Sequence, residues 1–352
     1  MTKSELTDLI KQEALNIGFT KVGVTTAEPF NEDADRFSAW VAGGAHGMMK
    51  WLERDHDKRR DVKNILPEAK SILSLALNYY HPGADGDVCP TAVGDDRSTR
   101  LSIGNNAIFP RGADVSSAVG QPSPAVQQTK AVRAGKISRY AWGTDYHEII
   151  PTMLRKLLAK IKELVPEAEG RYYSDTGPLL EKAIAERAGI GWRGKHTNLI
   201  TREMGSWVFL SEIILNIELE PDAPAEDMCG TCTRCIEACP TDALTPYELD
   251  SRKCISYLTI ELKPQNEIPA ELAAKMSGWI YGCDICQDVC PWNRFAEPTA
   301  ISEFAPREDI LALTQDSIER MDPEEFSNIF RKSPIKRTKL AGLKRNVRAL
   351  KP

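Results

Sequence analysis

Hydrophobic residues recur at helical spacing near the start of the chain. The positions that share one face are Leu6, Leu9, Ile10, Ala14 and Ile17. This spacing predicts an amphipathic helix from Thr2 to Ile17. Thr2 and Glu5 have the spacing of a capping box, and Gly18 is placed to end the helix.

The next hydrophobic stretches have the patterns of strands. Residues 19–25 alternate between apolar and polar side chains, which predicts a half-buried strand. Residues 71–79 are strongly apolar, which is typical of a strand buried on both faces. Between the two, a helical pattern runs from Phe37 to Arg54 and is interrupted at Gly43 and Gly44.

Residues 82–130 differ from their surroundings. They are rich in Pro, Gly, Ser, Asp and Asn and show no usable period, so we expect a long surface insertion. Cys89 lies inside this segment and is predicted to be an incidental free thiol.

Regular structure resumes at Lys136. The predicted elements are a strand that ends within residues 136–147, a helix over 146–165, a strand over 171–174, a helix over 179–188, a glycine-rich turn over 189–196, and strands over 198–201 and 206–215. Alternating strands and helices over residues 1–215 predict an α/β or α+β domain with a central sheet. Residues 300–352 have the pattern of several short helices.

Four cysteines stand at a spacing typical of iron–sulfur proteins. Cys229, Cys232, Cys235 and Cys239 form the pattern Cx2-Cx2-Cx3-C, and Pro240 follows. In bacterial ferredoxins, three cysteines of such a run bind one [4Fe–4S] cube and the fourth binds a second cube. The chain must therefore supply a second set of thiolates.

That second set comes from the run Cys283, Cys286 and Cys290, with Cys254 supplying the missing member. By spacing, the first cluster is assigned to Cys229, Cys232, Cys235 and Cys290, and the second to Cys239, Cys254, Cys283 and Cys286. Zinc also binds paired CxxC motifs, but it does not require two runs that end in Cx3-C-Pro. Disulfides are typical of small secreted chains, whereas this chain is long and shows no signal segment. We therefore predict two [4Fe–4S] clusters.

The composition is that of an ordinary globular protein. The chain has 352 residues, of which 42% are hydrophobic and 27% charged, enough for two or three domains. No apolar run approaches the length of a membrane span. The first residues lack the apolar core and the twin arginine of an export signal, so we expect a cytoplasmic protein.

The charge is unevenly distributed. The formal net charge is −5, yet residues 331–352 contain nine Lys or Arg and no Asp or Glu. The rest of the chain carries 36 basic against 50 acidic residues. A basic tail on an acidic body is suited to binding phosphates, and the alternative is a solvated helix face.

Asp175 is a candidate acid because it follows a predicted strand and precedes Thr-Gly-Pro. In that position it either points into a cavity or caps a helix that starts at Pro178, and the local pattern alone favours the cap. His147 and His196 are weaker candidates, because a single histidine is more often structural. The cobalamin signature Asp-x-His-x-x-Gly begins at Asp145 but lacks its glycine, so no histidine-ligated corrinoid is indicated.

Several motifs together resemble the epoxyqueuosine reductase family, which is related to the reductive dehalogenases. They are Arg139-Tyr-Ala-Trp-Gly-Thr-Asp-Tyr-His147, Asp175-Thr-Gly-Pro-Leu-Leu-Glu181, Gly189-Ile-Gly-Trp-Arg-Gly-Lys195, Gly205-Ser-Trp-Val-Phe-Leu210 and both cysteine runs. The resemblance covers most of residues 1–350. It implies an oxidoreductase that binds base-off cobalamin and two [4Fe–4S] clusters and reduces epoxyqueuosine to queuosine at the wobble position of tRNA.

The resemblance also implies roles for individual residues. Asp175 matches the proton donor beside the cobalt, a role for which we expect a raised pKa. The residues implied for the cobalamin pocket are Arg59, Arg139, Gly194, Lys195, His196, Thr197, Asn198, Gly205 and Ser206. Residues 343–346 match the helical C-terminal region, which helps to hold tRNA.

The predicted fold class is therefore α+β. It combines an N-terminal α/β cobalamin-binding domain (residues 1–215, with the insertion 82–130), a two-cluster ferredoxin-like module (216–295) and a short, HEAT-like helical region that contacts tRNA (296–352). The expected partners are tRNA and an external electron donor such as flavodoxin or ferredoxin. We expect a monomer that has no membrane association.

Two other functions would use part of the same sequence. A reductive dehalogenase shares the cofactors, but it usually carries a twin-arginine signal and has no use for a basic tail. A simple iron–sulfur electron carrier would need only the cysteine module, whereas the region before it exceeds 200 residues. Both comparisons favour the tRNA-modifying reductase.

Overall fold

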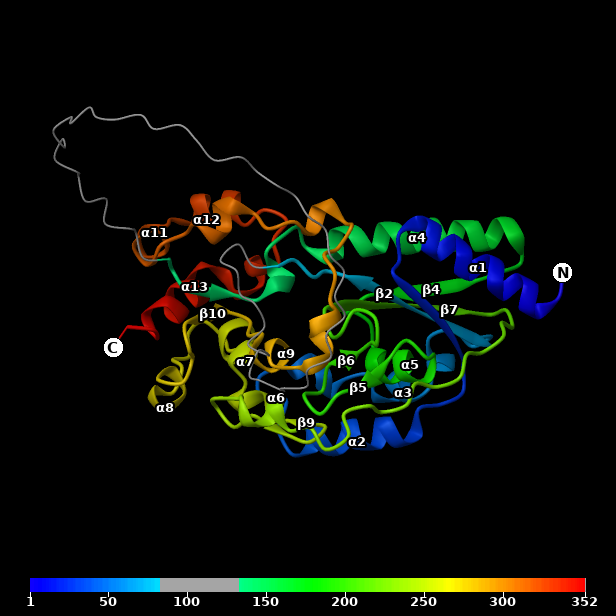
Figure 1. Ribbon diagram of the computed structural model, residues 1–352, viewed down its shortest axis with the longest axis horizontal. Coiled ribbons are helices and arrows are strands. Elements are labelled where there is room, and N and C mark those ends of the chain that lie inside the picture. The colour runs from blue at the N-terminus through cyan, green and yellow to red at the C-terminus, as the bar shows by residue number, and fades with distance from the viewer. Residues whose placement is uncertain (83–132, 352) are drawn as a thin grey trace, which may run out of the picture.

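A four-stranded sheet lies at the centre of the computed structural model, which describes residues 1–82 and 133–351 (Figure 1). The strands, in their order across the sheet, are β1 (Lys21–Thr26), β2 (Ser71–Asn78), β7 (Val208–Leu215) and β4 (Gly170–Tyr173). Every neighbouring pair is antiparallel. Of the two classes expected from the sequence, α+β is therefore the one that describes this sheet. The predicted insertion, apart from residue 82, and Cys89 lie outside the described residues.

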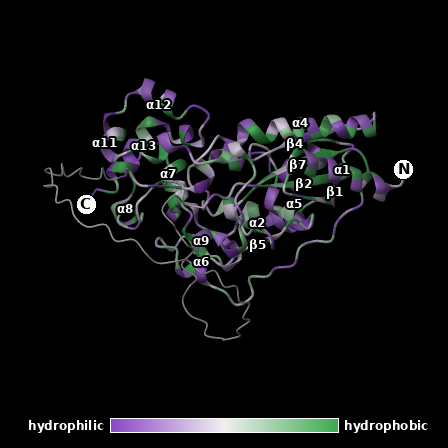
Figure 2. Cartoon of the chain, turned by 45° about the horizontal axis from the view of Figure 1, so that its top comes forward, coloured by the Kyte–Doolittle hydropathy of each residue, from purple (hydrophilic) through white to green (hydrophobic). Residues whose placement is uncertain are grey.

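Helices cover both faces of the sheet. α1 (Lys3–Ile17) and α4 (Tyr146–Leu164) lie on one face, whereas α5 (Glu181–Arg187), α3 (His56–Arg60) and α2 (Asn31–Ala42) lie on the other (Figure 1). In Figure 2, hydrophobic and hydrophilic residues interleave along α1 and α4, as amphipathic surface helices require.

The central strand β2 shows why its sequence is so strongly apolar. Leu73, Leu75 and Leu77 share a hydrophobic core with buried residues of α1 and α4. Ile72 points to the opposite face and packs in a second core with Ile184 of α5. Every residue of β2 is buried, which confirms the prediction of a strand buried on both faces.

The N-terminal elements largely follow their sequence signals. The Thr2 side chain accepts from the backbone N–H of Glu5, and Gly18 ends α1 in a left-handed conformation, which confirms the predicted caps. The helix predicted over residues 37–54 is partly wrong. α2 begins earlier, at Asn31, and ends at Ala42, because Gly44 and Gly47 adopt positive φ angles of 69° and 61° that a helix cannot contain.

The cysteine-rich segment is built from short elements. They are β5 (Trp192–Arg193) and β6 (Leu199–Ile200) before it, then α6 (Arg234–Glu237), β8 (Leu244–Thr245), β9 (Glu248–Leu249), α7 (Ile255–Ile260), α8 (Ala270–Ala273), β10 (Trp279–Tyr281) and α9 (Ile285–Asp288). α6 and α9 each lie within one cysteine run and contact each other. The two runs are therefore packed together, although about fifty residues separate them along the chain.

The C-terminal segment folds into short helices, as predicted. They are α10 (Glu308–Leu311), α11 (Gln315–Arg320), α12 (Pro323–Ile329) and α13 (Lys339–Arg348). Their core includes Phe330 and Val347, and it also takes in Ile137 of β3 (Lys136–Ile137) and Ile280 of β10. One hydrophobic core thus joins residues from all three segments that the sequence distinguishes.

Arg345 is a structural residue of this region. It is 3% exposed, and its guanidinium donates to the backbone oxygens of Leu258, Leu262, Lys263 and Asn266 at 2.7–3.1 Å. The last helix is therefore fastened to the α7 segment by a buried cation.

We expect Arg345→Met to lower the free energy of unfolding by about 3 kcal/mol, because the buried carbonyl oxygens lose their donor. Arg348→Met is the matched control, since Arg348 is exposed and pairs only with Glu319 at 3.0 Å, a contact expected to be worth less than about 1 kcal/mol. Chemical denaturation of both variants measures the difference. Equal effects would show that the buried cation contributes no more than a surface ion pair.

Candidate active site

The structure places the eight described cysteines in two groups of neighbouring thiols, all of them free of disulfides. Burial, together with the nearby thiolates of Cys229, Cys235 and Cys232, raises the pKa of Cys290 to about 11. These four residues are the members of the first predicted quartet. Cys290 therefore lies with the other run rather than with its own, as the ferredoxin spacing predicts.

The second group has the same character. Burial raises the pKa of Cys283, and Cys254 and Cys239 add to the effect. Burial also raises the pKa of Cys286 well above its usual value, with contributions from Cys283 and Cys254. The four members of the second predicted quartet are thus neighbours.

Zinc binds its thiolates at one ion, whereas a four-iron cube takes one thiolate at each of its irons. Among residues 1–82 and 133–351, no group of three or more His, Cys, Asp or Glu side chains is placed to hold one ion together.

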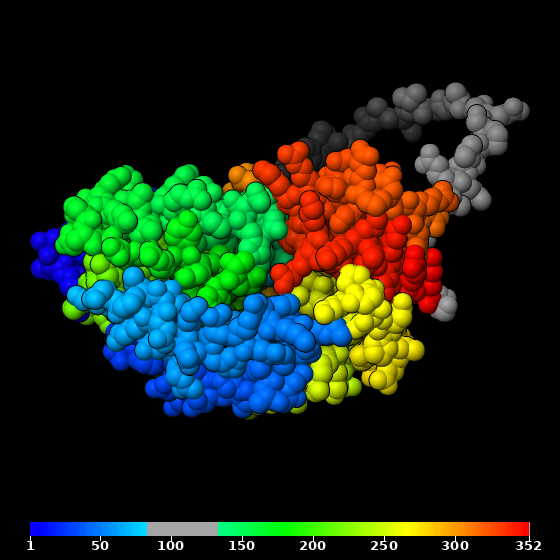
Figure 3. Space-filling view, turned by 180° about the vertical axis from the view of Figure 1, so that it is seen from behind, coloured from blue at the N-terminus to red at the C-terminus, as the bar shows by residue number. Residues whose placement is uncertain are grey.

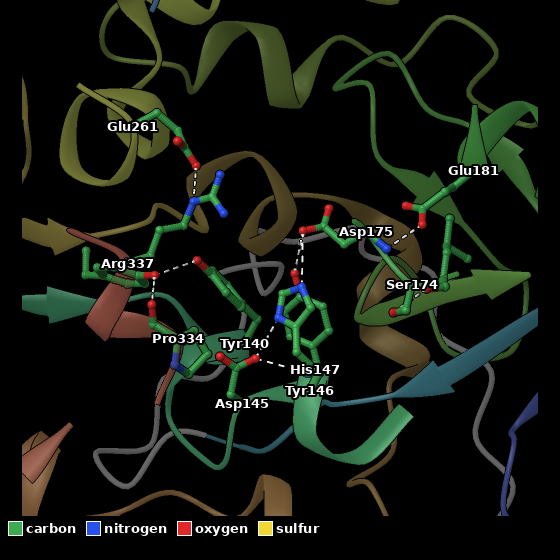
Figure 4. Close-up of polar contacts among 12 residues, drawn as sticks. Tyr140, Asp145, Tyr146, His147, Ser174, Asp175, Glu181, Glu261, Pro334 and Arg337 are labelled. Atoms are coloured by element: carbon green, nitrogen blue, oxygen red, sulfur yellow. Dashed lines mark hydrogen bonds and ion pairs between the residues drawn. The ribbon is translucent and has the colours of Figure 1, made fainter. Parts of the chain in front are cut away.

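Asp175 lies in the loop between β4 and α5 and does not cap a helix. α5 begins at Glu181 after Leu180, and no side chain caps it. The prediction that Asp175 caps a helix starting at Pro178 is therefore wrong. Instead, Asp175 has a positive φ of 59°, and its backbone N–H donates to Oε1 of Glu181 at 2.5 Å. This turn directs the carboxylate away from α5 and toward α4 (Figure 4).

Two residues of the first turn of α4 contact the Asp175 carboxylate. The hydroxyl of Tyr146 donates to Oδ2 at 2.9 Å, and Nε2 of His147 lies 3.6 Å from the same oxygen. On its other side, Nδ1 of His147 lies 2.8 Å from Oδ1 of Asp145 (Figure 4). His147 is therefore held between two carboxylates.

This arrangement fixes where the proton resides. Hydrogen bonds to Asp145 and to Asp175 raise the pKa of His147 to about 9. The hydrogen bond from His147 lowers the pKa of Asp175 against the effect of burial, and that of Tyr146 adds to the lowering. The raised pKa expected for Asp175 is therefore wrong in this arrangement. At neutral pH, Asp175 is ionised and the exchangeable proton sits on His147.

Further ionisable groups surround the loop on the α5 side. Burial, and then the Asp175 charge, raise the pKa of Glu181 to about 7. Glu212 of β7 is 0% exposed, and its carboxyl oxygens have no hydrogen-bond partner among the described residues. Burial and the nearby Glu181 raise its pKa well above the usual value.

Lys182 lies on the same side of the loop. The side chain is exposed, yet the surrounding protein desolvates the ammonium group and lowers its pKa. Its Nζ donates to the backbone oxygen of Thr197 at 2.8 Å, and the charge of Cys286 also acts on it. We refer to Tyr146, His147, Asp175, Glu181 and Lys182 as the Asp175 site. The site therefore adjoins the second group of thiols.

The residues implied for the cobalamin pocket, apart from Arg59, fall into two sets. His196, Thr197 and Asn198 lie beside Lys182. Desolvation lowers the pKa of His196 to about 4, so its ring is neutral, and Nδ1 accepts from the backbone N–H of Asn198 at 3.2 Å. The ring proton must then reside on Nε2, which is buried and has no partner among the described residues.

The other set fastens the cysteine runs to the rest of the protein. Arg139 pairs with Asp288 of α9 at 2.7 Å, and the Ser206 hydroxyl donates to Gln287 at 2.9 Å. Lys195 donates to the backbone oxygens of Gly230 and Cys232. Of the remaining two, Gly205 has a φ of 64° and lies against Asn293, whereas Gly194 donates from its backbone to Asn198.

Arg59 is a separate case. It is 9% exposed and donates to the backbone oxygen of Leu179, in the segment that follows Asp175. Its guanidinium also lies 5.1 Å from the ring centre of Phe37. Arg59 therefore stabilises the loop that carries Asp175 through its hydrogen bond to Leu179.

The sequence interpretation missed Tyr146, Glu181, Lys182 and Glu212, and it treated His147 as structural. Two signals were present. Three consecutive polar, ionisable residues, Asp145 to His147, stand at the start of an otherwise amphipathic helix. Glu212 interrupts the apolar strand Val208–Leu215 at a position where a surface-facing residue is not expected.

Two surface hollows lie elsewhere. One of about 580 Å³ is bordered by Arg202, Trp292 and Phe295, and one of about 300 Å³ lies under Gly189–Trp192. Neither includes a residue of the Asp175 site. The chemistry of the ionisable groups, rather than the shape of a hollow, identifies the candidate site.

We expect NMR titration of the histidine side chains to give His147 a pKa of about 9 in the wild-type protein. Since this pKa is raised above the unfolded value of about 6.5, the ion pair stabilises the fold fully below that pH and is lost as the pH rises through about 9. Asp145→Asn keeps the helix cap but removes a charge, and should move the His147 pKa back toward about 6.5. Asp61→Asn is the control, because Asp61 likewise caps a helical turn (Val62–Asn64) and accepts from the backbone N–H of Lys63 at 2.9 Å. A wild-type value near 6.5 would contradict the interpretation.

The chain is similar to known proteins along its whole length. A family model described as epoxyqueuosine reductase QueG, DUF1730, matches residues 116–176, and one described as a 4Fe-4S double cluster binding domain matches residues 228–293. The epoxyqueuosine reductase of Cellulophaga algicola is 41% identical over 99% of both chains. That of Escherichia coli K12 is 34% identical over 95% of this chain and 77% of its own length.

Solved structures give the same result. An epoxyqueuosine reductase with an epoxyqueuosine-modified tRNA-Tyr stem loop superposes with a TM-score of 0.79 at 32% identity, covering 99% of this chain and 81% of that one. The Bacillus subtilis enzyme, solved with its catalytic loop swung out of the active site, gives a TM-score of 0.80 at 31% identity, covering 99% of this chain and 82% of that one.

No helix in the described part of the chain is long and apolar enough to span a membrane.

Proposed function

Because this chain belongs to the epoxyqueuosine reductase family, we propose that it reduces epoxyqueuosine to queuosine at the wobble nucleotide of tRNA. The observation that carries the proposal is the Asp175–His147 pair, a proton source placed beside the second group of thiols. Loss of the epoxide oxygen as water consumes two electrons and two protons. The site therefore offers both of the supplies that the reaction needs.

The two groups of thiols fit two [4Fe–4S] clusters. Each group has four cysteines, and no disulfide competes for them. When bound, such clusters supply single electrons at low potential. The residues proposed as ligands are Cys229, Cys232, Cys235 and Cys290 for the first cluster, and Cys239, Cys254, Cys283 and Cys286 for the second. Because Cys286 lies near Lys182, the second cluster is the one closer to the Asp175 site.

The hydrogen-bond donors around Lys182 fit cobalamin. The buried N–H of His196 lacks a partner among the described residues, and the ammonium of Lys182 and the amide of Asn198 lie close to it. These donors suit the amide and phosphate oxygens on the periphery of a corrinoid. When bound, cobalamin supplies a strongly reducing, nucleophilic cobalt. Its proposed contacts remain those given by the family resemblance.

Asp175 and His147 deliver one of the two protons, and solvent water supplies the other. His147 holds it on Nε2 at neutral pH, and Asp175 Oδ2 lies 3.6 Å away and reaches the solvent-exposed side of the loop. Passing the proton from Nε2 to the carboxylate turns Asp175 into the acid that the departing oxygen requires. Tyr146 fixes the carboxylate so that the transfer has one geometry.

The tRNA would approach from the C-terminal side, but the basic tail is not the uncompensated run that the sequence indicates. Arg337 pairs with Glu261, and Arg348 and Lys351 pair with Glu319. Arg345 is buried. Exposed Lys336 and Lys339 are among the tail residues suited to contact phosphates.

The proposal also requires an electron donor, such as flavodoxin or ferredoxin. It further proposes that the protein is a monomer in the cytoplasm.

Protein reconstituted under anaerobic conditions should contain about eight irons, as two four-iron cubes imply. Cys254→Ser removes one ligand of the second cluster and should lower the iron content toward four. Cys89→Ser is the control and should change nothing. Tightly bound zinc, or about four irons in the wild-type protein, would contradict the assignment.

We expect Asp175→Asn to slow queuosine formation by about 100-fold or more, because an amide cannot deliver the proton. The variant keeps the size of the side chain and tolerates the positive φ. Queuosine formed in a single turnover is measured by nucleoside mass spectrometry, beside the cobalamin spectrum of the same sample. Asp242→Asn is a matched control, because Asp242 is also exposed and has a φ of 51°. Near-normal turnover with Asp175→Asn would remove this residue from the mechanism.

A further inference from the structure

Trp51 is a large aromatic residue that the protein leaves on its surface. It lies in a short 3-10 turn (Lys50–Glu53), and 38% of its surface is exposed. It belongs to none of the hydrophobic cores formed by the described residues. Burial of such a side chain normally contributes to stability, so a large aromatic residue left exposed can mark a binding surface.

Arg337 lies against Trp51 and is itself held in place. The guanidinium carbon is 5.2 Å from the ring centre, a cation–π distance. Nε of Arg337 donates to Oε1 of Glu261 at 2.6 Å, while about half of the Arg337 side chain remains exposed. The Trp51–Arg337 pair, as we call it, therefore presents a flat, cationic surface whose orientation is fixed.

The pair lies close to the Asp175 site. Figure 4 shows Arg337 across from Asp175, with Glu261 on its far side. The charge of each acts on the other, which is consistent with a short separation. In Figure 3, the segment around residue 50 meets the C-terminal segment and the 255–280 segment on one face of the molecule.

The charges around the pair favour an anionic partner. Lys50 and Arg54 flank Trp51, Lys336 and Lys339 flank Arg337, and all four are exposed. The nearby carboxylates are already occupied, because Glu261 binds Arg337 and Glu53 lies 3.0 Å from the His46 ring. An aromatic ring and a guanidinium plane within a basic surface are the features with which proteins stack unpaired nucleobases.

We infer that the Trp51–Arg337 pair stacks an unpaired base that flanks the wobble nucleotide. The inference rests on the proposed function. If Asp175 acts on the wobble base, that base must leave the stack of the anticodon loop, and its neighbours lose a stacking partner. A platform beside Asp175 replaces that partner and holds the loop in register for the reaction.

The test measures binding of an anticodon stem-loop RNA by fluorescence anisotropy, with the full chain carrying both clusters and cobalamin. We expect Trp51→Ala to weaken binding about tenfold and Trp51→Phe to weaken it much less. Phe295→Ala is the matched control, because Phe295 is 45% exposed and Arg294 lies 4.5 Å from its ring centre. The control should bind RNA as the wild type does.

A second measurement identifies the base. RNAs that carry an abasic site on one or the other side of the wobble nucleotide are bound to wild type and to Trp51→Ala. At one position the abasic RNA should bind wild type about tenfold more weakly, yet bind Trp51→Ala no more weakly than intact RNA does. Additive losses at both positions, or equal binding of intact RNA by wild type and Trp51→Ala, would overturn the inference.

The outcomes separate this inference from the proposed function. Wild-type protein that neither binds the stem-loop nor forms queuosine would overturn both. Wild-type protein that does both, beside a Trp51→Ala variant with unchanged RNA affinity, would overturn only the stacking role. The cobalamin spectrum of each variant shows whether Trp51 contacts the cofactor instead, and a lost spectrum with unchanged RNA binding would also overturn it.

Discussion

The convergence of two distant cysteine runs on shared sites is the constraint on which this structure depends. Cys290 lies with the thiols of the first run, and Cys239 lies with those of the second. Neither site is complete within one run, so α6 and α9 must stay in contact. Any movement of one run would separate thiols of both groups. The cysteine-rich segment is therefore one rigid unit rather than two independent loops.

A buried carboxylate connects this unit to the Asp175 site. Asp284, at the start of α9, is 1% exposed, and it accepts from the Ser138 hydroxyl at 2.5 Å and from the backbone N–H of Arg139 at 2.8 Å. Asp145 and His147 follow Arg139 within a few residues along the chain. The position of His147 is thus fixed, through covalent and hydrogen-bonded contacts, relative to the segment that carries the second group of thiols. Such registration is what electron and proton delivery to one substrate require.

Local patterns determined much of the fold, and contacts between distant residues determined the rest. The capping box at Thr2, the doubly buried β2 and the contact between the two cysteine runs could be predicted because each signal lies within a few residues or in a fixed spacing. The state of Asp175 could not, because its partner His147 comes from a helix that begins 29 residues earlier. The same limit applies to the basic tail, whose partner Glu261 is 76 residues away from Arg337.

The loop that carries Asp175 is held mainly by charge and hydrogen bonds. Asp175 and Thr176 are exposed, and the contacts of Asp175 run to Glu181, Tyr146 and His147. Burial elsewhere holds the ends of the loop, at Ser174 and Leu179. In the proposed mechanism, the protonation of His147 acts on two properties at once, since it would supply the proton and it attracts the carboxylate that would receive it. Once the proton has passed to Asp175, the attraction between the two side chains disappears. The acid form of Asp175 is consequently also the form that this site holds least firmly.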